Sequence, residues 1–339
     1  MQLLLAVFAR GLHGQCNAQA CIHDFAVNVT ERVLRMISGS AFCFLPRRCI
    51  ALCASLMLVA AIAPAGNLPT ALSVDNCADQ YLLALAERVQ IVAVSQDAQQ
   101  DFSYHAAVAR GLPRIHASSE ELISLKPDVV ISSWGWSARD RQLPEQHGIA
   151  FVQMRFGHSP EVIAENLRRV ALALNQSQSA EEIIERMEER LVRAQQRAQR
   201  IAVAENLTAA YVTPSGATSG SDTLVDSVIR MSGLRNVVAD RGYEGWRYLD
   251  LEQLVSDNPD MLVASFFELG SQHTDNWSIS RHNVMKKLLN TKPVVYLPSR
   301  YLGCSAWYFL DAVELIQDQV DSDTVATGMK ADFMAEGRF

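Results

Sequence analysis

Short apolar runs alternate with amphipathic stretches through the chain from residue 70 onward. The runs "TALSV" (70–74), "IVAVS" (91–95) and "DVVISS" (128–133) have the length and composition of buried strands. The stretch "YLLALAERV" (81–89), between the first two runs, has apolar residues at helical spacing. Alternation of this kind is typical of a parallel sheet that helices cover on both faces.

A long helical tract interrupts this alternation. It comprises residues 159–174 and 179–202, and its second part lacks Gly and Pro and carries Glu–Arg pairs at helical spacing. The alternation then resumes, with strands predicted at 208–214, 236–240, 261–267 and 294–299 and helices at 223–233, 283–293 and 308–320. We therefore predict an α/β fold, with two Rossmann-like lobes that have parallel central sheets and are joined by one long α-helix. A single connecting helix also predicts a stiff hinge with small closure.

The first 65 residues read as a targeting segment. The basic pair Arg47-Arg48 precedes an unbroken apolar run, 49–63, and Ala63-Pro64-Ala65 forms a small-x-small cleavage site. The run is shorter than the roughly 20 residues that a membrane-spanning helix needs, which favours a signal peptide over an anchored helix. We expect a periplasmic protein, exported by this signal peptide.

The predicted organisation follows from these elements. Met36 is a plausible start, because a signal peptide so far from the first residue is unusual. The predicted segments are a misassigned or disordered extension (1–35), the signal peptide (36–65), an N-terminal α/β lobe (66–172), the linker helix (173–202), a C-terminal α/β lobe (203–322) and a flexible tail (323–339).

Charge and cysteine content narrow the class of protein. The formal net charge is -7 and there is no basic cluster, so we expect no nucleic-acid partner. Five of the seven cysteines precede the predicted cleavage site, which leaves Cys77 and Cys304. In an oxidising compartment this pair can form a disulfide. The sequence leaves open whether it does.

One short element occurs twice. "EELISLKPDVVISS" begins at Glu120 and "EQLVSDNPDMLVAS" begins at Glu252. Ser118 with Glu121, and Asp250 with Gln253, fit a helix N-terminal capping box, which places each glutamate at the second helical position. The macrodipole alone favours an acidic residue there, by about 0.3–1 kcal/mol. Duplication of one lobe would repeat this preference without any further purpose.

The chain resembles the single-helix-linked periplasmic substrate-binding proteins of the cobalamin/ferric-siderophore ABC importer family. The likeness runs from about Pro69 to Val320 and rests on "ADQYLLALA", "EELISLKPDVVIS", the linker helix, "TSG" (218–220) and "PDMLV". It implies that Glu120 and Glu252 dock onto arginines of a membrane ABC permease, with one docking glutamate on each lobe. It also implies a monomeric carrier whose ligand, a metal chelate such as a ferric siderophore or cobalamin, lies in the interlobe cleft.

Loops after the strands supply the candidate ligand contacts, because ligands of open α/β sheets bind beyond the carboxyl ends of the strands. Four of the five tryptophans fall in these loops, where flat aromatic walls suit a large planar ligand. The predicted ligand-binding residues are Asp75, Cys77, Tyr104, Trp134, Trp136, Arg155, Tyr243, Trp246, Arg300 and Tyr301. For Trp246 the resemblance adds that cobalamin-binding members carry a ligand-facing tryptophan at the matching place. Those members also have a disulfide within the second lobe, which Ser232 and about Ile316 replace here.

Two other classes of protein remain as alternatives. A Zn/Mn ion-binding protein of the related metal-transport branch needs clustered ligands, whereas the histidines here are scattered. A chelatase-like or hydrolase-like enzyme is the second, although the chain lacks a phosphate loop and a Gly-x-Ser-x-Gly elbow. We expect no catalytic residues, no cofactor and no protein-bound metal.

Overall fold

Two parallel sheets organise the chain in the computed structural model, which describes residues 68–267 and 279–321. The first sheet has the order β3-β2-β1-β4-β5, and every neighbouring pair is parallel. Its strands are β1 (Ala71–Ser73), β2 (Ile91–Ser95), β3 (Arg114–Ile115), β4 (Val129–Ser132) and β5 (Ala150–Gln153). β1 and β4 are fully buried because helices cover both faces, as their unbroken apolar runs predict.

The second sheet repeats this plan with the order β11-β10-β6-β8, again parallel throughout. Its strands are β6 (Thr208–Val212), β8 (Arg235–Asn236), β10 (Met261–Ser265) and β11 (Val294–Leu297). A small antiparallel pair, β7 (Ala217–Ser219) and β9 (Trp246–Tyr248), is added to this lobe. The predicted fold class is confirmed, and the antiparallel pair is an addition that the sequence pattern did not indicate.

Helices surround both sheets. In the first lobe they are α3 (Asn76–Leu85), α4 (Ala106–Ala109), α5 (Ser119–Leu125), α6 (Ala138–Gln146) and α7 (Pro160–Leu174), with the 3-10 turn η2 (Arg88–Gln90). In the second they are α9 (Leu224–Met231), α10 (Val237–Asp240), α11 (Leu251–Asp257), α12 (Asn283–Thr291) and α13 (Phe309–Asp321), with η4 (Ile279–Arg281) and η5 (Ser299–Tyr301).

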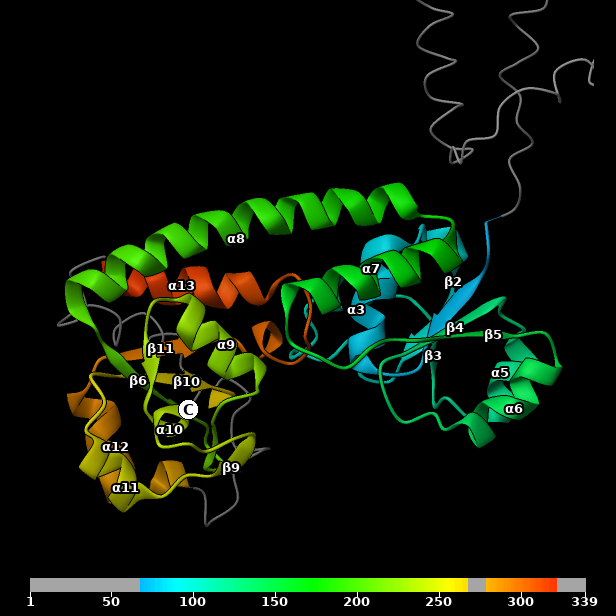
Figure 1. The fold of residues 1–339 in the computed structure, drawn as a ribbon. Helices are drawn as coiled ribbons and strands as arrows, with labels where there is room; N and C mark the ends of the chain where they lie inside the picture. Colours follow the sequence, from blue (N-terminus) through cyan, green and yellow to red (C-terminus); the bar gives the residue numbers. More distant parts are fainter. Residues whose placement is uncertain (1–67, 268–278, 322–339) are drawn as a thin grey trace, which may run out of the picture. The chain divides into compact units, whose positions relative to one another are not determined.

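One long helix, α8 (Ser177–Glu205), connects the lobes and packs against α7 of the first lobe and α13 of the second (Figure 1). Its apolar positions join a single core cluster that includes residues of both sheets. Within the described residues, no helix is long and apolar enough to cross a membrane. The predicted signal peptide and C-terminal tail lie outside the described residues.

Two predicted elements differ from the structure. Residues 236–240 were predicted as a strand, but pairing ends at Asn236 and the helix α10 follows. The side chain of Asn236 accepts a hydrogen bond from the backbone N–H of Val238 and so begins a helical turn. The first helix was predicted from Tyr81, but α3 already begins at Asn76 because Asp75 caps it.

The repeated element forms the same structure in each lobe. Ser118 begins α5 with the predicted capping box, and Asp250 caps α11. The second box is incomplete, because Gln253 instead donates its side-chain amide to Asp257. The C-cap residues of both helices, Lys126 and Asn258, are left-handed, with φ of 50° and 45°.

The aspartate of each Pro-Asp pair ties two neighbouring strands together. Asp128 accepts hydrogen bonds from the backbone N–H and the hydroxyl of Thr70, at 2.8 and 2.7 Å. Asp260 accepts the same two bonds from Thr208, at the same two distances. These bonds join the starts of adjacent strands at the edge opposite the carboxyl ends, so this half of the repeat is structural.

Candidate functional site

A disulfide joins the two lobes at the carboxyl ends of their strands. It links Cys77, in the first turn of α3, to Cys304, in the segment before α13. Cys304 is buried, whereas Cys77 is half-buried. The sequence left the state of these cysteines open, and the structure pairs them. In this state Cys77, a predicted ligand contact, has no free thiol to offer a ligand.

Hydrogen bonds and stacked rings also join the two lobes in this region. The ring of Tyr104 stacks on Tyr308, with centroids 3.9 Å apart. The hydroxyl of Tyr81 donates to the carbonyl of Ser305 at 2.8 Å, and the hydroxyl of Tyr104 donates to Asp311 at 2.7 Å. These contacts form the lobe junction. Its residues are Cys77, Tyr81, Tyr104 and His158 of the first lobe and Cys304, Ser305, Tyr308 and Asp311 of the second.

The phenol of Tyr104 is held in its neutral form. Burial and the neighbouring Asp311 carboxylate raise the pKa of Tyr104. Asp311 also pairs with Arg190 of α8 at 2.6 Å, and Arg190 pairs with Glu314 at 2.8 Å. Hydrogen bonding to Glu314 and Asp311 raises the pKa of Arg190 against the opposing effect of burial. The hydroxyl of Tyr104 is therefore committed to this network.

Two histidines belong to the same region. The Nδ1 of His158 lies 2.7 Å from the hydroxyl of Ser305, and burial lowers the pKa of His158. Burial also lowers the pKa of His105 to about 4. Within the described part of the chain, the Nε2 of His105 has no hydrogen-bond partner. Both rings are therefore neutral near pH 7.

A hollow of about 450 Å³ lies at the carboxyl ends of the first lobe's strands. Its lining consists of Val74, Asp75, His116, Ala117, Ser118, Ser119, Trp134, Gly135, Trp136 and Asp140. Three predicted residues thus come together here: Asp75, Trp134 and Trp136. The lining carries two carboxylates and no Lys or Arg, so it favours a ligand surface that donates hydrogen bonds or is positively charged.

These three residues differ in how far contacts within the protein already occupy their side chains. Asp75 caps α3 and accepts two further bonds, from the N–H and the hydroxyl of Ser133, at 2.8 and 2.5 Å. Trp136 packs on Phe151 at 5.4 Å and belongs partly to the core. Trp134 is 71% exposed. Of these three residues, Trp134 is consequently the most exposed to a ligand.

Asp79 of α3 is a buried carboxyl group that the sequence pattern did not indicate. It accepts hydrogen bonds from Ser73 at 2.5 Å and from the N–H and hydroxyl of Ser95 at 2.9 and 2.6 Å. Burial nevertheless raises the pKa of Asp79 to about 6. It joins the ends of β1 and β2, and its position one helical turn after Asp75 was the only sign in the sequence.

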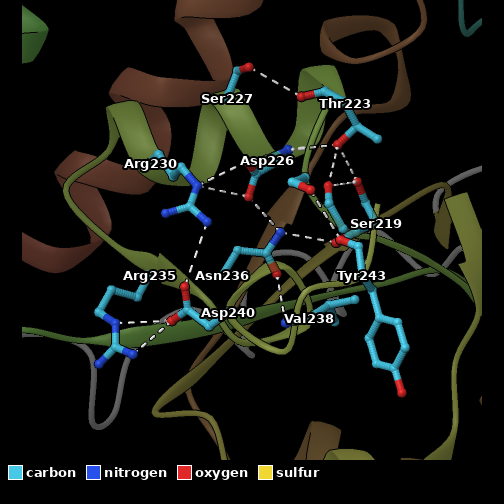
Figure 2. Close-up of polar contacts among 12 residues, drawn as sticks. Ser219, Thr223, Asp226, Ser227, Arg230, Arg235, Asn236, Val238, Asp240 and Tyr243 are labelled. Atoms are coloured by element: carbon cyan, nitrogen blue, oxygen red, sulfur yellow. Dashed lines mark hydrogen bonds and ion pairs between the residues drawn. The ribbon is translucent and has the colours of Figure 1, made fainter. Parts of the chain in front are cut away.

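In the second lobe a glycine and a buried polar network position the aromatic segment 243–248. A Cβ atom on Gly220 would lie 2.0 Å from the carbonyl oxygen of Tyr243, so only glycine allows the two loops to approach. The amide of Asn236 donates to the carbonyl of Ser219 at 3.0 Å and to Asp226 at 2.9 Å. Figure 2 shows this network, with the ring of Tyr243 extending away from it.

The segment exposes three aromatic rings and one cation. Tyr243, Trp246 and Tyr248 are 38%, 58% and 84% exposed. The guanidinium of Arg247 lies over the ring of Tyr243 at 3.5 Å. No carboxylate of the described residues pairs with Arg247, so its charge is available to an anionic group on a ligand. Tyr248 was not among the predicted site residues.

A narrow hollow of about 40 Å³ lies beneath this segment. It is lined by Thr218, Val237, Val238, Arg241, Tyr243, Arg247, Tyr248, Leu249, Asp250, Gln253, Leu254 and Asp257. Arg241 is neutralised there by an ion pair with Asp257. The hollow is too small for a chelate, which leaves the exposed aromatic surface above it as the part able to contact one.

The remaining predicted ligand contacts lie elsewhere. Arg155 pairs with Glu165 of its own lobe at 2.5 Å, an exposed ion pair. Arg300 is exposed and lies 5.3 Å from the ring of Tyr301, which packs against the core beside Tyr104. Phe156, 88% exposed in the loop after β5, is an aromatic that the predicted set omitted.

The two glutamates of the repeat are both exposed. Glu120 and Glu252 stand in the first turns of α5 and α11. Neither carboxylate makes an ion pair within residues 68–267 and 279–321. Both are thus available to a partner. Across those same residues, no group of three or more His, Cys, Asp or Glu side chains is arranged to hold a metal ion.

Comparison with known proteins defines the class. Two α/β lobes on one long helix, with aromatic side chains exposed outside their parallel sheets, have the architecture of a two-lobed solute-binding protein. A family model described as "Periplasmic binding protein" matches residues 72–279, more than half of the chain, and the chain belongs to this family. Membership implies a periplasmic location.

Solved structures share the fold at low identity. The periplasmic heme-binding protein RhuT from Roseiflexus sp. RS-1 is 19% identical, with a TM-score of 0.60 over 75% of this chain and 100% of that one. The periplasmic vitamin B12 binding protein BtuF of Vibrio cholerae is 19% identical, with a TM-score of 0.55 over 75% and 97%. A structure described as an ABC-type Fe3+-hydroxamate transport system from Saccharomonospora viridis is 16% identical, with a TM-score of 0.54 over 76% and 94%. No curated protein matches the sequence.

Proposed function

We propose that this protein is the solute-binding component of an ABC importer and that it captures a metal chelate between its lobes. The observation that carries the proposal is the set of exposed aromatic side chains outside the two parallel sheets: Trp134 and Phe156 in the first lobe, Tyr243, Trp246 and Tyr248 in the second. Exposed rings of this number suit a large, semi-rigid ligand with broad apolar faces. The family assignment supports a binding role over an enzymatic one.

The chemistry of the two lobes supports a chelate with polar edges. Asp75 and Asp140 line the first hollow, where each also accepts hydrogen bonds within its own lobe, whereas Arg247 offers a cation on the second lobe. A ligand held by both lobes would present hydrogen-bond donors to one side and an anionic or oxygen-rich edge to the other. Ferric hydroxamates, corrinoids and haem all combine a metal, broad faces and polar substituents.

Equilibrium dialysis tests this proposal. The protein, expressed as the full chain and purified from the exported fraction, is dialysed against haem, cobalamin, a ferric hydroxamate, Zn²⁺ and Mn²⁺. We expect one chelate to be retained at one molecule per protein chain and neither free ion to be retained. Retention of Zn²⁺ or Mn²⁺ without any chelate would instead support the metal-ion carrier.

We further propose that Glu120 and Glu252 are the docking charges for the permease. Both are exposed at equivalent places in a repeated element, and the bonds of the Thr–Asp pairs hold the opposite ends of the same elements. Charges at the rim of an interface set orientation and association rate. Glu120→Arg with Glu252→Arg should therefore abolish uptake while leaving chelate retention unchanged. Glu185→Arg, an exposed change on α8, is the matched control.

A further inference from the structure

The two cysteines of the disulfide between the lobes differ in their exposure to solvent. Cys304 is 4% exposed, whereas Cys77 is half-buried at the second helical position of α3. The side-chain amide of Asn76 lies 3.5 Å from the sulfur of Cys304 and donates toward it. An attacking thiolate therefore reaches Cys77 more easily, and Asn76 is placed to stabilise negative charge on Cys304.

We propose that the Cys77–Cys304 bond is a reducible tie between the lobes, opened by a dithiol reductant that attacks Cys77. One thiolate of the reductant forms a new S–S bond with Cys77, and Cys304 leaves as a thiolate and takes up a proton. The second thiol of the reductant then attacks its own mixed-disulfide sulfur and releases Cys77. The protein gains two electrons and two protons, and the reductant becomes a disulfide.

The first turn of α3 favours this release. α3 has ten residues and is capped by Asp75, so its backbone dipoles are aligned behind Cys77. Cysteine at a helix N-terminus is stabilised as the thiolate, which makes Cys77 a good leaving group when the second thiol of the reductant attacks the mixed disulfide. The structure thus places Cys77, the less buried cysteine of the pair, where its release as a thiolate is chemically favoured.

The other contacts of the lobe junction still hold the lobes together when the bond is cut, although less tightly. The stack of Tyr104 on Tyr308, the bond from Tyr81 to Ser305 and the ion pair of Arg190 with Asp311 do not depend on the disulfide. The common core along α8 also links the lobes. Reduction therefore loosens the lobe junction locally and leaves both sheets folded, so that the lobes separate more often.

Differential alkylation with hydrogen exchange tests the tie. The exported protein is treated with dithiothreitol under native conditions, alkylated and digested, and the peptides of Cys77 and Cys304 are followed by mass spectrometry. We expect the linked pair to disappear and Cys77 to be alkylated about tenfold faster than Cys304. Amide exchange in 102–105 and 301–308 should become about tenfold faster, while exchange in β4 and β10 should be unchanged.

A variant separates the tie from general effects of the reductant. Cys77→Ser with Cys304→Ser should show the fast junction exchange without dithiothreitol and should not respond to it. Three results would overturn the proposal: a bond that resists dithiothreitol until the whole chain unfolds, reduction without any change in junction exchange, or reduction that unfolds both sheets. None of these measurements uses the ligand, so their outcome is independent of the proposed transport function.

Discussion

The two lobes are alike at one edge of their sheets and different at the other. At the amino-terminal edge, Thr70 with Asp128 and Thr208 with Asp260 make matching hydrogen bonds at matching distances. At the carboxyl-terminal edge, the first lobe has a hollow with two carboxylates and no arginine or lysine, and the second exposes tyrosines around Arg247. The shared plan positions the elements, and the divergent loops give each lobe its own ligand chemistry.

Core leucines of the repeat should show the largest effect and the closest match between lobes. Leu122 is fully buried in the first lobe, and Leu254, at the equivalent position, is 2% exposed. Leu122→Ala and Leu254→Ala should each lower the free energy of unfolding by about 2–5 kcal/mol, through lost burial and a cavity. Chemical denaturation measures both. A silent substitution in one lobe would show that the two copies are not structurally equivalent.

Gly220→Ala should have the next largest effect on stability, and this effect should be confined to the second lobe. The added methyl group meets the backbone of Tyr243, which a side-chain rotation cannot relieve. We expect a loss of about 2 kcal/mol and displacement of the aromatic segment, seen as faster amide exchange in 243–248. Gly242→Ala is the control, because nothing lies within 4 Å of its Cβ and only its φ of +80° is strained. Equal losses from the two variants would contradict the close-approach argument.

The hydrogen bonds of Thr70 with Asp128 and of Thr208 with Asp260 should contribute less to stability, and equally in both lobes. Thr70→Val and Thr208→Val each remove a hydroxyl that donates to an aspartate, at a cost of about 1 kcal/mol. Thermal unfolding of the two variants gives the comparison. Thr291→Val removes an exposed hydroxyl hydrogen bond to the carbonyl of Lys287 within α12, which joins no strands, so it should change the melting temperature less. Unequal losses would mean that the matching distances do not reflect matching energies.

The smallest net effect should come from pH, because two groups of the first lobe oppose one another. The pKa of Asp79 is raised from 3.8 to about 6, so its contribution to stability falls as pH rises between those values. The pKa of His105 is lowered from 6.5 to about 4, so its contribution falls as pH drops through that range. In Asp79→Asn only the His105 effect remains, so the free energy of unfolding should rise with pH from 4 to 6. In His105→Gln only the Asp79 effect remains, so the free energy of unfolding should fall over the same range. Denaturation at several pH values decides; a slope that neither variant changes would contradict the burial of these groups.

The sequence predicted the fold well because the signal for it is local. Apolar runs of strand length, separated by amphipathic stretches, specify parallel strands whatever their partners are, and 91–95 became β2 without change. The errors arose where a capping side chain decides the structure. Asp75 and Asn236 begin helices inside segments that read as a loop and a strand.

The candidate site was harder to predict because its contacts join distant residues. Trp134 and Trp246 were selected because both were predicted to lie in loops; both are exposed, but Trp246 lies in strand β9. Tyr104 and Tyr301 were selected by the same rule, but they pack in or against the lobe junction. No pattern within either segment shows that Tyr104 meets Tyr308 and Asp311, some 200 residues away.

Tryptophan fluorescence during titration with haem, cobalamin and a ferric hydroxamate tests the central claim most directly. The wild-type protein is compared with Trp134→Ala, Trp246→Ala and Leu172→Ala, the last an exposed change on α7 at the opposite edge of the sheet. We predict saturable quenching by one chelate at micromolar concentration or below, weakened by either tryptophan substitution and unchanged by Leu172→Ala. Absence of quenching by every chelate, or binding that neither tryptophan substitution weakens, would contradict a chelate held between the two lobes.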